Sequence, residues 1–307
     1  MKTINLALTK KIAYTLTSIV LIVVISCKNA SEKKANDKLG WAVLKKPLNN
    51  KTVDVNNKIV KITASLEFKV FPKRMETYGT IFAAMGNVSD EFLQEVATTY
   101  HQMFPQGDGI DIKKQQEVLN TFIQYGSLIP VLSEHHDSAS EDTNKGLDEA
   151  FMSDKYSVCD VIMTNVERRQ AMEVVEHLLH FITDIGLHFV YPEQWSFTEG
   201  NSEITKVMNT AIEKGLYNVS SYSDMVADGK EAYQRVIVQE FAYWLISTYW
   251  NLQEPYGNIA EQEWKVDNKK QLLEQLPSGY ALVKNTVDEI MKAPSKEVLD
   301  GFKKYEK

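Results

Sequence analysis

Histidines and acids are concentrated in one short segment of this 307-residue chain. Six side chains in it can bind a metal ion or move a proton: Glu173, Glu176, His177, His180, Asp184 and His188. The chain has six histidines in all, and three of them lie within twelve residues here. Imidazole and carboxylate groups in close succession are suited to zinc binding and to general acid–base chemistry.

The segment 165–190 is predicted to form one long helix. At about 100° per residue its apolar side chains gather on one side, and the acids and histidines gather on the other. An amphipathic helix with a solvated polar face is the simplest explanation of such a pattern. Imidazole is an uncommon choice for a solvated face, which favours a site instead.

A second helix, predicted over 229–252, supplies a possible partner. Its sequence is apolar nearly all round, and Glu240 sits in the middle. Burial of an unpaired carboxylate costs several kcal/mol, so Glu240 must meet a cation, a histidine or a metal ion. The alternative partners are Arg235 on the same helix and a tyrosine hydroxyl.

Together the two helices predict a zinc site. Glu176 and His180 are four residues apart and point the same way, and Glu240 completes a set of three protein ligands. His177 would then accept the proton, with Glu173 and Asp184 supporting the ligands. The competing ligand set is His177, His180 and Glu240, with Glu176 or Glu173 as the base.

These motifs resemble the zincin metallopeptidases, in which an HExxH helix is followed by a helix that bears a glutamate. Here the sequences are EHLLH at 176–180 and QEFAYW at 239–244, with the first two residue types of HExxH exchanged. Residues 165–250, with Glu263-Trp264, also resemble an uncharacterised family of secreted bacterial proteins with EExLH and EYFYW helices and a GxxxxYP motif, here 186–192. The resemblance implies a shared scaffold and a metal ion.

The N-terminus carries a targeting signal over residues 1–26. Three lysines precede a mostly apolar stretch, and Ser26-Cys27 closes it. This order resembles a bacterial lipoprotein signal, in which Cys27 becomes the lipid-bearing N-terminus. Several acyl chains, each contributing about 0.8 kcal/mol per buried CH₂, would hold the protein to a membrane. A plain secretory signal or a single membrane anchor is the alternative.

Residues 27–40 are polar and are expected to form a flexible tether. The chain has 34 basic and 41 acidic residues, so loss of the three lysines of the signal leaves a formal charge of −10. That charge argues against nucleic acid as a partner, because nucleic-acid binding needs a basic surface. With Cys27 lipidated, Cys159 has no second cysteine in the chain for a disulfide.

The remaining pattern predicts a mainly helical α+β protein. Residues 41–140 are expected to form a small α/β lobe, with strands near 58–62, 65–71, 77–85 and 128–132 and two helices between 89 and 125. The acidic, serine-rich run 133–146 is the expected boundary, and 141–307 the helical, zincin-like lobe. Pro130 would confine strand 128–132 to a sheet edge, because proline has no N–H to donate.

The sequence therefore predicts a lipid-anchored protein of the bacterial cell envelope. The leading hypothesis is a zinc-dependent hydrolase that acts on a peptide or protein. The alternative is a non-catalytic envelope binding or assembly protein that keeps the scaffold. In that case His177, His180 and Glu240 would form a buried hydrogen-bond cluster.

Overall fold

The computed structural model describes residues 47–54, 59–64, 67–133, 139–198, 200–257 and 263–307. The predicted targeting signal, Cys27 and the predicted tether lie outside these residues. Helices and one five-stranded mixed sheet make up the fold, so the predicted mainly helical α+β class is confirmed. None of the described helices is both long enough and apolar enough to cross a membrane.

The sheet runs in the order β1-β2-β3-β4-β5. Its strands are β1 (Val60–Ala64), β2 (Lys73–Thr77), β3 (Thr80–Ala84), β4 (Leu128–Leu132) and β5 (Ile162–Met163). The first three strands are antiparallel, and β3, β4 and β5 are parallel. The predicted strand over 65–71 is wrong where it is described, since residues 67–70 form a turn. The single strand predicted over 77–85 is also wrong, because a tight turn divides it into the ends of β2 and β3. Tyr78 and Gly79 in this turn both have positive φ, as a two-residue hairpin turn of this type requires.

Strand β4 lies inside the sheet, so the prediction of an edge strand is wrong. Leu128 donates its N–H to Ser157 and Leu132 accepts from Thr164, so the alternate residues of β4 that include Pro130 face β5. Pairing on that side is made at Ser157 and again at Ile162. Residues 159–161 are outside any strand between these points. Residues 159–161 therefore leave the hydrogen-bonded pairing with β4 at the point where Pro130 has no N–H to donate.

Helices α2 (Asp90–Met103) and α3 (Ile112–Gln124) connect β3 to β4. Both begin where predicted, because the side chains of Ser89 and Asp111 accept backbone N–H groups of the first turns. Helix α4 (Glu141–Met152) follows β4 and leads to β5. Strand β5 comes after the boundary predicted near residue 140, and the division into two lobes stays a prediction.

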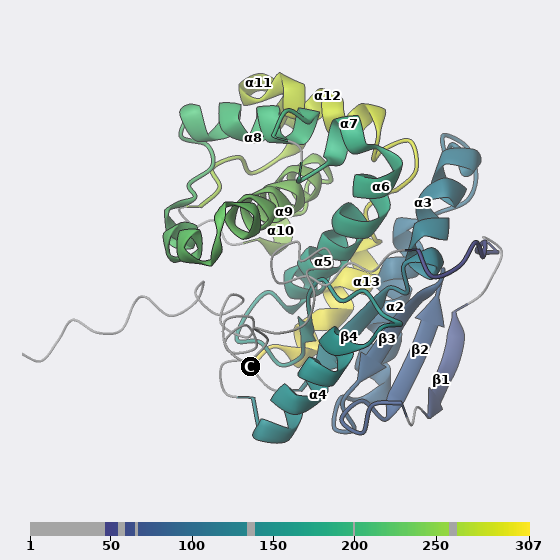
Figure 1. The fold of residues 1–307 in the computed structure, drawn as a ribbon. Helices are drawn as coiled ribbons and strands as arrows, with labels where there is room; N and C mark the ends of the chain where they lie inside the picture. Colours follow the sequence, from purple (N-terminus) through teal and green to yellow (C-terminus); the bar gives the residue numbers. More distant parts are fainter. Residues whose placement is uncertain (1–46, 55–58, 65–66, 134–138, 199, 258–262) are drawn as a thin grey trace, which may run out of the picture.

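The predicted long helix is present from 170 to 190 as three joined elements: α5 (Gln170–Phe181), the π-helix η2 (Ile182–Leu187) and α6 (His188–Val190). It begins five residues later than predicted, because Asn165 and Arg169 adopt left-handed backbone conformations that cannot continue a right-handed helix. Helix α5 contacts α2, β5 and α13 on one side and α9 on the other, and Figure 1 shows it in the middle of the fold.

The other helical elements cover α5 and one another. They are α7 (Pro192–Trp195), α8 (Glu203–Glu213), η3 (Ser220–Asp228), α9 (Lys230–Tyr249), α10 (Gln253–Tyr256), α11 (Lys269–Gln275), α12 (Pro277–Asn285), α13 (Lys296–Gly301) and η4 (Phe302–Tyr305). Turns and extended chain separate α12 from α13. Pro294 lies in that break, and proline disfavours a helical conformation in the residue before it.

Candidate metal centre

The polar stripe of α5 is buried. His177 and His180 are 1% and 0% exposed, and Asp184 in η2 is 1% exposed, whereas Glu173 and Glu176 are partly accessible. Helices pack on both sides of α5, so the alternative of a solvated face is wrong. Charged groups in this position require compensation from one another or from an ion.

Glu240 comes from the middle of α9 and is also buried, with 5% of its surface exposed. Its Oε2 lies 3.6 Å from Nε2 of His180. Arg235, an alternative partner for Glu240, forms an ion pair with Asp184. The packing of α9 on α5 therefore sets the Glu240 carboxylate against an imidazole.

The structure brings together the three ligands predicted for zinc. One ligand atom each from Glu176, His180 and Glu240 lies within 4.8 Å of the other two. Two ligands of a tetrahedral zinc ion, each about 2.0–2.1 Å from the metal, are about 3.3 Å apart, close to the 3.6 Å between His180 and Glu240. The competing set of His177, His180 and Glu240 is not among the converging groups found in the described residues.

Sequence reasoning missed one residue of this centre, Asp160. It lies in the stretch that leaves the sheet ladder opposite Pro130, and it is 3% exposed. Its Oδ2 accepts a hydrogen bond of 2.7 Å from Nδ1 of His180, and its Oδ1 lies 3.7 Å from Nε2 of His177. A buried acid beside an apolar strand was the available signal, of the same kind that singled out Glu240.

The contacts of His180 orient its ring. Because Nδ1 donates to Asp160, Nε2 is the nitrogen that points toward Glu240 and that a metal ion would take. This Nε2 is buried and has no hydrogen-bond partner among the described residues. Carboxylate–histidine pairs of this kind orient metal-binding imidazoles. The donor set, three converging atoms with an unpartnered imidazole nitrogen, therefore fits zinc.

His177 is placed differently from the proton acceptor that the sequence suggests. Its Nδ1 donates to the carbonyl oxygen of Glu173 at 2.6 Å, and its Nε2 faces Asp160 rather than the Glu176–Glu240 side. The Glu173 carboxylate accepts the backbone N–H of Met163, which ties α5 to β5.

The pKa values follow from burial and from these pairs. Burial raises the pKa of Glu176 to about 8, and the nearby Glu240 carboxylate adds to the shift. Burial lowers the pKa of His177, but the carboxylates of Asp160, Glu173 and Glu176 outweigh it and bring the pKa to about 9. For Asp160, the two imidazoles likewise outweigh burial and lower the pKa. The protein environment favours charged histidines beside Asp160 and a protonated Glu176.

The far end of the stripe belongs to a separate group. Asp184, predicted to support the ligands, pairs with the buried Arg235 of α9. His188 stacks on Phe197 with 4.1 Å between ring centroids. Burial and the Arg235 charge lower the pKa of His188 to about 4. Cys159 is buried beside this group, and burial raises the pKa of its thiol well above the ordinary value.

The aromatic residues near the end of α9 pack into the core. Glu263 accepts hydrogen bonds from the Tyr222 hydroxyl and from Nε1 of Trp244, at 2.7 and 2.9 Å. Nε1 of Trp264 donates to Thr248. These contacts hold the chain after α10 against α9, on which Glu240 is carried.

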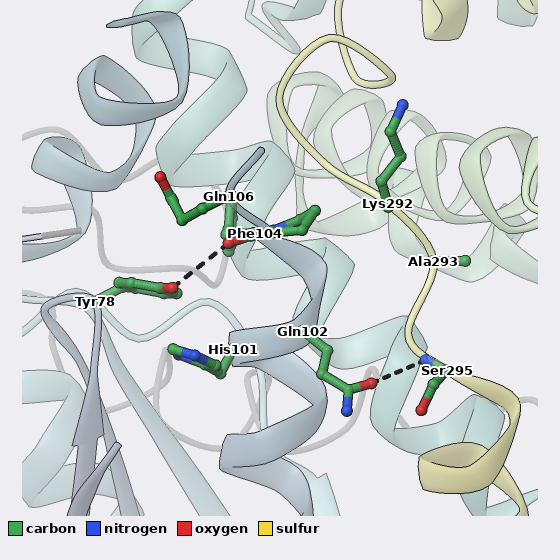
Figure 2. A pocket seen from close by; sticks show the side chains of 9 residues that line it. Tyr78, His101, Gln102, Phe104, Gln106, Lys292, Ala293 and Ser295 are labelled. Atoms are coloured by element: carbon green, nitrogen blue, oxygen red, sulfur yellow. Dashed lines mark hydrogen bonds between the residues drawn. The ribbon is translucent and has the colours of Figure 1, made fainter. Parts of the chain in front are cut away.

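A hollow elsewhere on the surface contains none of the metal-centre residues. Figure 2 shows it between the end of α2 and the chain before α13, with His101 stacked on Tyr78 and Gln102 accepting from the Ser295 N–H. The Tyr78 hydroxyl donates to the carbonyl of Phe104. These contacts engage the polar groups of Tyr78 and Gln102 within the protein.

No protein-family model, curated protein or solved structure matches this chain.

His188 gives a pH-dependent stability that can be measured. Its folded-state pKa of about 4 lies below its unfolded value of about 6.5. The contribution of neutral His188 to the free energy of unfolding is therefore present above pH 6.5 and is lost as the pH falls toward 4. We expect His188→Phe, which keeps the stack on Phe197, to reduce the loss of unfolding free energy between pH 7 and pH 5 by about 2 kcal/mol. Urea unfolding at both pH values measures it, and equal losses in the two proteins would contradict it.

Proposed function

We propose that Glu176, His180 and Glu240 hold a zinc ion between α5 and α9. The observation that carries the proposal is the convergence of their ligand atoms within 4.8 Å, from two helices that are distant in sequence. The buried Nε2 of His180, without a hydrogen-bond partner among the described residues, adds to it. A cation also offsets the repulsion between the Glu176 and Glu240 carboxylates, which raises the pKa of Glu176.

We further propose that the centre catalyses hydrolysis of peptide bonds. Zinc supplies an acidified water and a Lewis acid when it is bound. The chain supplies the orientation, because the Asp160 carboxylate holds the His180 ring with Nε2 toward Glu240. His177 holds a proton between Glu173 and Asp160, next to Glu176 in the sequence. The partly accessible Glu176 is the ligand nearest to solvent.

A non-catalytic envelope binding or assembly protein is the second candidate. The observation that favours it is the surroundings of His177, which occupies the position of the catalytic glutamate of HExxH. Its Nδ1 is engaged by the Glu173 carbonyl, and its raised pKa of about 9 keeps the ring protonated at neutral pH. An imidazolium donates a proton but does not accept one.

We also propose that the protein is localised to the bacterial cell envelope. A lipid on Cys27 would anchor the protein to a membrane of the bacterial cell envelope, and the polar residues 27–40 would separate the folded part from the surface. The proposal rests on the basic, apolar and Ser-Cys order of the N-terminus.

Zinc content tests the metal centre. We expect zinc to co-purify with the wild type when no chelator is used, and His180→Ala to lose it, because this variant removes the shared imidazole. His188→Ala is the matched control, since it deletes another buried histidine of the same continuous helix. Elemental analysis of the three proteins gives the answer, and negligible zinc in the wild type would refute the centre.

Peptide cleavage separates the two candidate functions. Zinc-loaded wild type should cleave members of a mixed peptide library detected by mass spectrometry, and Glu240→Gln should lose at least tenfold in rate because a ligand charge is removed. Bound zinc without any cleavage would reject the hydrolase and leave the binding protein.

Lipid attachment has an internal control, because the chain has two cysteines. In bacteria grown with labelled palmitate, the wild type and Cys159→Ala should carry the label, and Cys27→Ser should not. Label that persists in Cys27→Ser would exclude the predicted anchor.

A further inference from the structure

The ring of His177 presents a nitrogen that the proposed zinc site does not use. Its Nδ1 donates to the Glu173 carbonyl at 2.6 Å, and a carbonyl can only accept, so this hydrogen bond fixes a proton on Nδ1. Its Nε2 points toward Asp160 at 3.7 Å. The ring is 1% exposed, and Nε2 has no hydrogen-bond partner among the described residues.

Neither protonation state of Nε2 gives this nitrogen a hydrogen bond to Asp160 within normal distance. If Nε2 carries a lone pair, that lone pair faces the ionised Asp160 carboxylate and is repelled by it. If Nε2 carries a proton, the buried N–H makes no hydrogen bond within normal distance, which costs about 1–3 kcal/mol. A metal ion bound by both Nε2 and the carboxylate removes both penalties.

We infer that Asp160, His177 and His180 hold a second divalent cation of the zinc class, on the opposite side of the His180 ring from Glu240. Their ligand atoms lie within 4.8 Å of one another, and all three side chains are buried. Two tetrahedral zinc ligands are about 3.3 Å apart. Asp160 Oδ1 lies 3.7 Å from Nε2 of His177, close to that value, and Asp160 Oδ2 lies 2.7 Å from Nδ1 of His180, in a hydrogen bond that the ion would replace. The inference rests on the proposed function, because the two positions share His180.

The sequence places two Glu-His pairs on one face of α5. Glu173 and His177 are four residues apart, and so are Glu176 and His180, so the same Glu-His spacing occurs twice with an offset of three residues. His177 then meets the Asp160 carboxylate, and His180 meets both Asp160 and Glu240.

Binding of the second ion changes the protonation of His180. The ion takes the place of the Nδ1 proton that is now donated to Asp160, and that proton goes to solvent. With one ion on each ring nitrogen, His180 would carry no ring proton, because both would have passed to solvent. No electron transfer is involved.

Zinc stoichiometry tests the inference on the full chain. Apo protein is titrated with zinc alone, and bound metal is counted by native mass spectrometry. We expect about two zinc ions per chain in the wild type, about one in Asp160→Asn, about one in Glu240→Gln and none in His180→Ala. Asp160→Asn and Glu240→Gln are matched amide replacements, one for each position, and His188→Phe should bind as the wild type does.

The outcomes separate this inference from the proposed function. One ion that is lost in Glu240→Gln but kept in Asp160→Asn overturns the second position and leaves the first. One ion lost in Asp160→Asn but kept in Glu240→Gln supports the Asp160 position and overturns the Glu240 set. One ion that both replacements remove indicates a single shared site and overturns the second position. The number of zinc ions bound per wild-type chain shows whether a second ion is held, even if a variant does not fold.

Discussion

The cost of burying charge at the centre of the fold is the constraint on which this structure depends. Helix α5 is enclosed on both sides, yet its stripe carries imidazoles and carboxylates. Removal of such groups from water costs several kcal/mol each unless partners are supplied. Asp160 and Glu240 face the two histidines, and Arg235 faces Asp184.

The surrounding architecture supplies those partners from distant parts of the chain. Pro130 has no N–H, and opposite it the chain leaves the sheet, which places Asp160 beside His180. Helix α9 packs on α5 and carries both Glu240 and Arg235. The sheet thus contributes one acid and the C-terminal helices another, on opposite nitrogens of one imidazole.

The centre leaves two buried imidazole nitrogens without a hydrogen bond from the part of the chain that the structure describes. Buried polar atoms are nearly always hydrogen-bonded, yet Nε2 of His177 and Nε2 of His180 have no such partner among the described residues. Two unpartnered imidazole nitrogens beside carboxylates destabilise a protein core but are suited to binding a cation. The unpartnered Nε2 of His180 supports the proposed zinc site, and that of His177 supports the second position.

The sequence by itself determined the local features. Helix starts at Ser89 and Asp111 were predictable because the capping residue and its helix are adjacent in the chain, and the Glu176–His180 pairing follows from helical spacing. Glu240 was identifiable because an acid in an apolar helix needs a partner. Only the tertiary structure decided the rest. Asp160 reaches the histidines through a break in a parallel sheet, and Asp184 and His188 are drawn to Arg235 and Phe197 instead. These outcomes depend on which distant elements pack together, and long-range packing leaves no periodic signal in a single sequence.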